Sequence, residues 1–195
     1  MNVLIILGHP NSGSFNHAIA EACIAQITEN GHTVVYHDLY NEQFNPILGS
    51  TYSSKDTHDI EQHQFDLVKS DGIIIIHPNW WGQPPAVVKG WLDRVFLPEV
   101  AYKLEKEADG NYISKGLLKA QIAIVLNTSN TPVELEETIF KDPLETIWKE
   151  RVFNFCGVSN FKRINFRVIK DSDMHQRILW LTEIRQLIDN SFPKQ

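Results

Sequence analysis

The chain has only two cysteines, Cys23 and Cys156, among its 195 residues. Neither shows metal-site or redox-pair spacing, so we expect two buried thiols and no disulfide framework. The chain also lacks any apolar run approaching the roughly 18 residues needed to cross a bilayer. Its apolar N-terminal segment has no basic flank and no small-residue cleavage site, which argues against an export signal. We therefore expect a cytoplasmic protein without membrane insertion.

Positive charge is scarce. The chain carries 18 lysines and arginines against 24 acidic residues, and its formal net charge of -6 repels nucleic acid and anionic membranes. Hydrophobic residues make up 43% of the chain, which is ordinary for a globular protein and argues against disorder. No internal repeat, linker or low-complexity tract divides the sequence, so we expect residues 1–195 to form one domain.

Strand and helix patterns alternate along the chain, which indicates an α/β fold. Apolar runs typical of strands lie at 3–7, 33–36, 72–76, 121–126 and 161–168. Apolar residues at helical spacing predict helices at 15–30, 59–70, 84–96, 144–155 and 178–188. Because parallel neighbours need long right-handed crossovers, we expect a five-stranded parallel sheet, order 2-1-3-4-5, between two helical layers. Residues 39–58 are predicted to be irregular, and 97–118 to form an inserted loop.

Ligands of such an open sheet bind beyond the carboxyl ends of the strands, at the point where the strand order reverses. In the order 2-1-3-4-5, the first, third and fourth strands are neighbours at that point. The loops after these strands are predicted to begin at Gly8, His77 and Asn127. Chemistry is therefore expected in these three loops.

The first loop, Gly8–Asn16, joins a buried strand to a helix and presents free backbone N–H groups to an anion. Ser14 suits the N-cap of that helix. Ser14 and Phe15 stand where a nucleotide triphosphate loop needs lysine and serine or threonine, and the glycine pattern for dinucleotides is absent. A single phosphate held by neutral donors fits better. The alternative is an ordinary capped helix start, and for His9 alone a structural role remains open beside a catalytic one.

The second loop, His77–Pro85, contains Trp80 and Trp81 beside Gly82. Adjacent tryptophans at the end of a buried strand suggest a platform for a flat ligand. The alternative is that both indoles fill the core or a contact between subunits.

The third loop offers small polar residues that can donate hydrogen bonds to the polar edge of a bound ring. The candidates are Asn127, Thr128, Ser129 and Asn130. An ordinary polar turn is the alternative.

Two segments closely resemble the flavodoxin-like NAD(P)H:quinone reductase family. They are Pro78–Phe96 and the first loop, with His9, Ser14, Phe15 and Asn16. The similarity extends over most of residues 1 to 165. It implies a flavodoxin-like three-layer sandwich, a flavoprotein that reduces quinones or similar planar acceptors by two electrons, and a homodimer with its site at the interface.

The resemblance also implies roles for individual residues. The first loop would hold the flavin phosphate and its neighbouring chain, and the second would line the flavin ring. The implied flavin contacts are His9, Phe15, Asn16, Gln64, Pro78, Asn79, Trp80 and Trp81. Four further motif residues have helical spacing that suggests packing and salt bridges, and they are left out of the site: Lys89, Trp91, Asp93 and Arg94.

The match weakens in the third loop. Ser129 and Asn130 stand where FAD-containing members have a glycine pair, and the tyrosine–histidine pair that follows in those members is missing. No proton donor is carried over, so the catalytic residue stays unknown, and Asn130, Glu134 and Glu137 are only neighbourhood candidates. The chain has no long C-terminal extension of the kind that accompanies an adenine-binding half. We therefore expect FMN, with FAD less favoured, and no metal.

The family resemblance implies an oxidoreductase that moves a hydride from NAD(P)H through FMN to a planar acceptor in a ping-pong reaction. Quinones, nitroaromatics and azo compounds are all open as acceptors. Two other functions are weighed against it: a flavodoxin-type electron carrier, and an ancillary regulatory subunit of a potassium efflux system, which some relatives of this family are.

Overall fold

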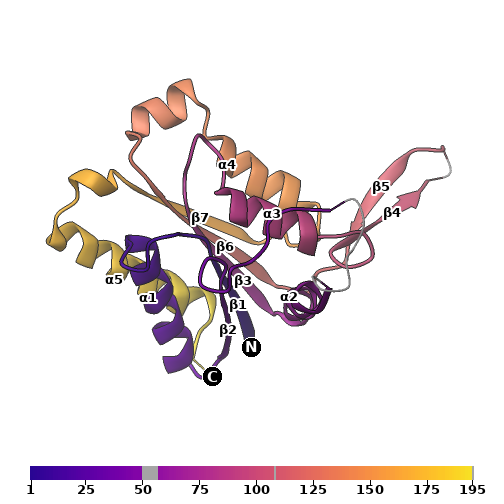
Figure 1. Ribbon diagram of the computed structural model, residues 1–195, viewed down its shortest axis with the longest axis horizontal. Coiled ribbons are helices and arrows are strands. Elements are labelled where there is room, and N and C mark those ends of the chain that lie inside the picture. Colours follow the sequence, from indigo (N-terminus) through magenta and orange to yellow (C-terminus); the bar gives the residue numbers. More distant parts are fainter. Residues whose placement is uncertain (50–56, 108, 195) are drawn as a thin grey trace.

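A computed structural model describes residues 1–49, 57–107 and 109–194 of the chain. Five parallel strands form its central sheet in the order β2-β1-β3-β6-β7 (Figure 1). Their bounds are β1 Asn2–Leu7, β2 Thr33–Asp38, β3 Gly72–Pro78, β6 Ile122–Ser129 and β7 Phe161–Arg167. This is the order 2-1-3-4-5 expected from the sequence once the two strands of a separate hairpin are left aside. The three-layer flavodoxin-like prediction is confirmed.

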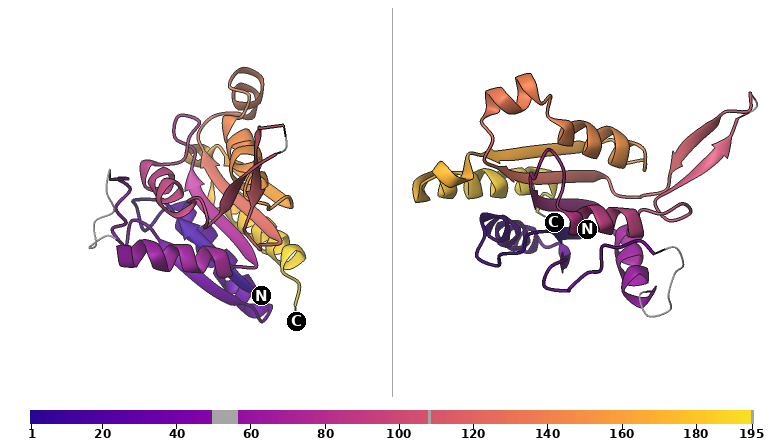
Figure 2. Two further views of the ribbon diagram at one scale, coloured as in Figure 1. Left: turned by 90° about the vertical axis from the view of Figure 1, so that its right-hand side faces the viewer. Right: turned by 45° about the horizontal axis from the view of Figure 1, so that its top comes forward.

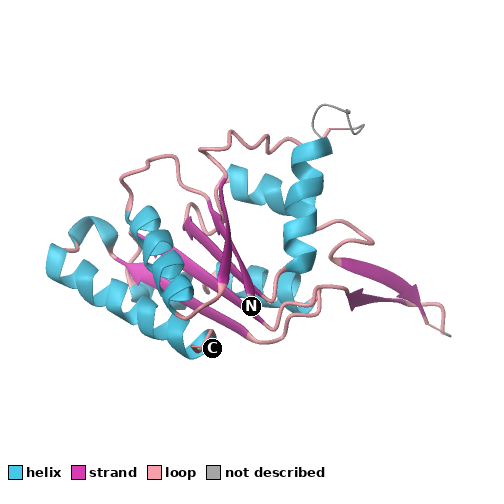
Figure 3. Cartoon of the chain, turned by 90° about the horizontal axis from the view of Figure 1, so that it is seen from below, coloured by secondary structure: helices cyan, strands magenta, loops and turns pink. Residues whose placement is uncertain are grey.

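Helices cover both faces of the sheet (Figure 3). On one face α1 (Phe15–Glu29) and α5 (Met174–Ser191) pack on the odd-numbered residues of β1, such as Ile5. The other face carries α2 (Thr57–Lys69), α3 (Ala86–Val95), α4 (Pro143–Thr146) and the π-helical η2 (Ile147–Asn154). Successive strand residues point to opposite faces, so each central strand is buried on both sides. This explains why these strands read as continuous apolar runs.

The predicted loop at 97–118 is wrong in part, because it contains an antiparallel hairpin. Strands β4 (Tyr102–Lys106) and β5 (Tyr112–Gly116) pair with each other and extend away from the body (Figure 2). Both strands are largely exposed on both faces, with Leu104 57% and Tyr112 66% exposed. Tyr102 and Leu104 alternate with Lys103 and Glu105, but a run of five residues that buries little is a weak strand signal.

The strands that carry the second and third loops are longer than predicted. β3 continues through Pro78 and β6 through Ser129, because His77 pairs with Asn127 and Pro78 with Thr128. Polar residues at these positions concealed the last ladder pairs. Short π and 3-10 turns, η1 at Leu135–Ile139 and η3 at Ile169–Asp171, were also not predicted. Part of the segment predicted to be irregular, 50–56, lies outside the described residues.

The state of the cysteines and the apolar character of the helices were both expected from the sequence. Cys23 and Cys156 are both free and buried, as predicted. Among the helices of the described ranges, none combines the length and apolar character needed to cross a membrane.

The helix α3 contains a glycine at which the fold leaves no space for a side chain. A Cβ at Gly90 would overlap the carbonyl oxygen and Cα of Pro46. Alanine gains about 1 kcal/mol over glycine in a helix interior, but overpacking costs about 1–3 kcal/mol. We expect Gly90→Ala to lower the free energy of unfolding by up to about 2 kcal/mol, measured by urea denaturation. In Gly13→Ala the added Cβ meets only Asn11 Oδ1 at 3.6 Å. This control should be neutral, and equal effects of the two substitutions would contradict the prediction.

Candidate functional site

Direct contacts join the three strand-end loops to one another. Asn16 Nδ2 donates to Thr128 Oγ1 at 2.9 Å, which links the first loop to the third. The backbone N–H of Asn79 donates to Thr128 O at 2.7 Å, which links the second loop to the third. The rings of His9 and Trp80 lie 6.3 Å apart, which brings the first loop to the second. The three loops therefore converge on one place at the carboxyl edge of the sheet.

The first loop prepares the start of α1 for an anion. Ser14 is the N-cap, as predicted, and its side chain accepts from the backbone N–H of His17. The N–H groups of Phe15 and Asn16 donate to no group among the described residues. Free N–H groups and the helix dipole together favour negative charge at this position.

The side chain of Asn16 has a buried hydrogen-bond acceptor without a donor. The residue is 2% exposed, and its Oδ1 has no hydrogen-bond partner within the described ranges. A buried acceptor without a donor costs about 1–3 kcal/mol. This atom lies on a residue that joins the first and third loops, so a ligand with hydroxyl groups between those loops would supply the donor.

Phe15 contributes to the first loop differently from the expectation. Its ring packs edge-on against Phe166 at 6.1 Å and near Trp180 at 5.7 Å, with the Arg177 guanidinium over it. The side chain therefore fastens α1 to α5. Its backbone N–H is the group that faces an anion at the helix start.

The second loop turns sharply and displays both tryptophans. Trp81 and Gly82 have positive φ angles of 58° and 71°, and Trp80 and Gln83 exchange backbone hydrogen bonds across them. Trp80 is 42% exposed and Trp81 is 101% exposed. The interpretation that both indoles fill the core is therefore wrong. A large apolar ring held outward on a left-handed backbone is costly without a function.

The side chain of Asn79 stabilises this turn through hydrogen bonds. Its Oδ1 accepts from the N–H of Gly82 at 2.9 Å, and its Nδ2 donates to Glu136 Oε1 at 3.1 Å. Glu136 lies on η1 and is 2% exposed. Sequence reasoning named its neighbours Glu134 and Glu137 as candidates and missed Glu136. A run of acidic residues gives no signal of which one turns inward.

Most side chains of the third loop form hydrogen bonds with other residues of the protein. Asn127 is buried beside His77, and its Oδ1 accepts from Arg163 Nε at 2.7 Å. Ser129 Oγ accepts from the N–H of Thr131 at 3.0 Å, and Asn130 Oδ1 accepts from the N–H of Lys170 at 2.9 Å. Asn127, Ser129 and Asn130 thus hold the loop in shape.

Thr128 and Ser129 each keep a hydroxyl proton to donate, because among the described residues each hydroxyl accepts a hydrogen bond, from Asn16 Nδ2 and from Thr131 N–H respectively, and donates none. Gln64, in contrast, lies away from the three loops. It is on α2, and its Nε2 donates to the carbonyl of Arg94 at 3.3 Å. The four motif residues left out of the site are structural: Lys89 pairs with Asp93, Trp91 is in the core and Arg94 is buried.

A second polar cluster lies at the end of β2, beside a cavity of about 480 Å³. His37 contacts Glu42 at 2.9 Å and Asp66 at 3.0 Å, and His63 Nε2 lies 3.5 Å from Glu42. Burial by itself lowers the pKa of His37, but the two carboxylates outweigh it and the net pKa is raised. Burial, with the charge of His37, lowers the pKa of His63 to about 4.

His37, Glu42 and His63 are close enough to hold a metal ion together. Their hydrogen bonds, however, favour protonated ring nitrogens over metal-ligating ones. Trp91 Nε1 donates to His63 Nδ1 at 3.3 Å. His63 must then carry its proton on Nε2, the nitrogen that faces Glu42, where a metal would need a lone pair. We therefore interpret the cluster as a hydrogen-bonded network that connects the end of β2 to α2.

Known proteins resemble this chain in sequence and in fold. The family model described as flavodoxin-like fold matches residues 1–181. A Haemophilus influenzae protein named as an uncharacterized NAD(P)H oxidoreductase is 38% identical over 168 residues, covering 82% of this chain and 80% of that protein. An NAD(P)H:quinone oxidoreductase structure from Methanothermobacter marburgensis is 25% identical, with a TM-score of 0.79 over 98% of this chain and 96% of that one.

A third comparison shows the fold alone. The structure of an FMN-dependent NADH-azoreductase from Bacillus anthracis, in complex with FMN, has a TM-score of 0.79. It is 16% identical and covers 98% of this chain and 100% of that chain.

Proposed function

The chain belongs to the flavodoxin-like fold family, and we propose that it acts there as an NAD(P)H-dependent oxidoreductase that reduces quinones or similar flat acceptors with a bound flavin. The observation that carries the proposal is the convergence of the three loops through Asn16, Asn79 and Thr128. The names of its relatives support the reaction class, since they include an NAD(P)H oxidoreductase and an NAD(P)H:quinone oxidoreductase.

The donor set at the site fits FMN. The N–H groups of Phe15 and Asn16 suit one phosphate, and the unpartnered Oδ1 of Asn16 suits the hydroxyls of a ribityl chain. Trp80 and Trp81 offer the apolar surface that a planar ring needs. One helix N-terminus serves a monophosphate, so FMN is preferred to FAD. When bound, the flavin supplies the redox chemistry by taking a hydride from NAD(P)H and delivering two electrons to the acceptor.

The residues of this chain orient the reactants and exclude water. The turn at Trp81 and Gly82 is held by Asn79, and Asn79 is held by Glu136, so the platform keeps its shape between turnovers. NAD(P)H and the acceptor both have flat rings that suit this one platform. They therefore bind in turn, which gives ping-pong order, and flatness matters more than functional group, so nitroaromatics and azo compounds remain candidates beside quinones.

We also propose that the protein works as a cytoplasmic homodimer. Exposed apolar side chains surround the same edge of the sheet, among them Trp81, Ile139 (66% exposed) and Phe140 (52% exposed). Clustered exposed apolar surface is typical of an interface. Two free buried thiols suit a reducing compartment.

The visible spectrum of the purified protein tests the proposed function. Flavin absorbance, FMN released on denaturation, and quinone-dependent NAD(P)H oxidation are the expected results. A colourless protein that gains no NAD(P)H oxidation when FMN is added would contradict the proposal. A flavin-containing protein with a stable one-electron form and no reaction with NAD(P)H would instead indicate an electron carrier.

Asn16 provides a sharper test of the site. Asn16→Ala removes the bond to Thr128 and the unpartnered acceptor, and leaves the Thr128 hydroxyl without its donor. We expect FMN affinity to fall about 10- to 100-fold, measured by quenching of flavin fluorescence. Asn111→Ala, in the distant hairpin, is the matched control and should bind FMN like the unmodified chain. Equal affinity in both variants would remove Asn16 from the site.

A further inference from the structure

A chain of polar contacts runs from the first loop to the end of β2. Ser14 Oγ lies 2.9 Å from His17 Nδ1, and His17 Nε2 lies 3.2 Å from Asp38 Oδ2. The side chains of His17 and Asp38 are only 13% and 15% exposed. Asp38 is itself fixed, because its Oδ1 accepts from the backbone N–H groups of Tyr40 and Asn41 at 3.1 Å. Ser14 at the helix start is therefore coupled to a histidine held by a carboxylate.

The partners of His17 determine where its protons are. A carboxylate accepts hydrogen bonds and does not donate them, so His17 Nε2 must carry a proton toward Asp38. In the neutral ring, Nδ1 is then a lone pair and can only accept the hydroxyl proton of Ser14. Ser14 would turn an oxygen lone pair toward the helix start, which repels a phosphate oxygen.

Protonation of His17 reverses this arrangement. The added proton sits on Nδ1 and donates to Ser14 Oγ, which also accepts from the backbone N–H of His17. Both lone pairs of Ser14 are then occupied, and its own proton is released to donate outward. The cationic ring also adds positive charge beside the free N–H groups of Phe15 and Asn16.

We propose that His17, positioned by Asp38, couples phosphate binding at the first loop to the uptake of one proton. The proton comes from solvent and is held at His17 Nδ1 while the phosphate is bound, so Ser14 changes from acceptor to donor. This inference rests on the proposed function, which places a flavin phosphate at the start of α1. The pair acts through Ser14 and is a positioning pair, since neither member needs to touch the ligand.

Two other titratable groups lie near His17. His9, in the loop after β1, has its ring 6.3 Å from that of His17, and its pKa is lowered chiefly by burial and also by the charge of His17. Tyr36, on β2, has its pKa raised to about 12 by burial and by the nearby charges of Asp38 and Glu21. At neutral pH Tyr36 already holds its proton and cannot take up another, whereas His9 is neutral and could, so His9 has to be separated from His17 by a variant.

From the remaining face, α5 brings Arg177 over the ring of Phe15 at 5.9 Å. A guanidinium keeps its charge at all these pH values. It strengthens anion binding equally at each pH and adds no proton linkage.

Calorimetry on the full chain, freed of flavin, measures the linkage directly. FMN is titrated in two buffers of different ionisation enthalpy at about pH 8, where its phosphate is already a dianion because the second pKa is about 6. We expect net proton uptake, up to about one per FMN, and affinity that falls about 3- to 10-fold per pH unit between about pH 7 and 8.5. Riboflavin, which has no phosphate, should bind without uptake.

Variants separate the pair from its neighbours. His17→Gln should bind FMN without proton uptake and with a flat pH profile, and Ser14→Ala should show the same loss. His9→Gln should keep the uptake even if its affinity changes. No uptake by the unmodified chain, uptake that persists in His17→Gln, or equal uptake with riboflavin would overturn the proposal while leaving flavin binding intact. Failure of both flavins to bind at every pH would overturn the proposed function and this inference together.

Discussion

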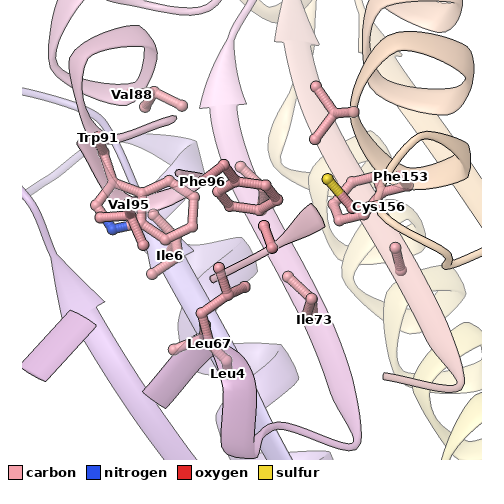
Figure 4. Packing of buried hydrophobic residues seen from close by; sticks show 14 of the residues in the cluster. Leu4, Ile6, Leu67, Ile73, Val88, Trp91, Val95, Phe96, Phe153 and Cys156 are labelled. Carbon is pink, nitrogen blue, oxygen red and sulfur yellow. The ribbon is translucent and has the colours of Figure 1, made fainter. Parts of the chain in front are cut away.

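Trp91→Ala is expected to lower the free energy of unfolding by about 3–5 kcal/mol. Trp91 is fully buried in the core between the sheet and α3, where its ring meets Phe96 edge-on at 5.4 Å (Figure 4). Its Nε1 also donates to His63 Nδ1. Alanine leaves a cavity that the surrounding strands cannot collapse to fill, and it removes the donor from a buried ring. Urea denaturation followed by circular dichroism measures the change.

Trp81→Ala is the matched control, because it removes the same side chain from a fully exposed position. We expect its free energy of unfolding to stay within about 0.5 kcal/mol of the unmodified chain. Its quinone-dependent NAD(P)H oxidation should fall, since Trp81 belongs to the proposed platform. Similar stability losses for the two tryptophans would contradict the assignment of one to the core and the other to the site.

Acid is expected to destabilise the protein through His77 by about 3 kcal/mol between pH 6.5 and 4. Burial is the main cause that lowers the pKa of His77 to about 4; the hydrogen bond to Pro78 opposes this shift, and the charge of Arg163 contributes to it. An unfolded histidine titrates near 6.5, and each pKa unit corresponds to about 1.4 kcal/mol. The unfolded chain therefore binds a proton in this range that the folded chain refuses. Stability is complete above about pH 6.5 and is lost as the pH falls toward 4.

The surroundings of His77 explain why it stays neutral. Its Nδ1 donates to Pro78 O at 2.8 Å, and its Nε2 accepts from Trp148 Nε1 at 3.0 Å. A second proton on Nε2 would face a donor. His77→Gln should reduce the slope of unfolding free energy against pH in this range, whereas His175→Gln, at an exposed position, should not. Unchanged slopes in both variants would exclude His77 as the source of acid sensitivity.

The sequence predicts the sheet well because its central strands are buried on both faces. Continuous apolar runs such as 72–76 are stable only in the interior of the fold. Their alternation with helices indicates that the strands are parallel. The hairpin β4–β5 escapes such reasoning, since its two strands are only five residues long and bury little. The ends of β3 and β6 also escape it, because His77 and Asn127 are polar yet buried through bonds to each other.

The site is predictable where it depends on chain order and unpredictable where it depends on packing. Strand order alone brings the loops of Asn16, Asn79 and Thr128 to one edge. The partnership of His17 with Asp38 joins a helix to an adjacent strand, and the residue types give no sign of it. The same holds for Glu136, which is buried on η1 although its residue type does not distinguish it from its acidic neighbours.

The order of the strands has a consequence for synthesis on the ribosome. β1, β2 and β3 are neighbours, so three of the five strands of the sheet can assemble once Pro78 has emerged. β6, the partner of β3, begins only at Ile122. At about 5–20 residues per second, the edge of β3 stays unpaired in the nascent chain for roughly 2–9 seconds. Such an apolar edge invites aggregation, and chaperones that bind nascent chains would find their target there.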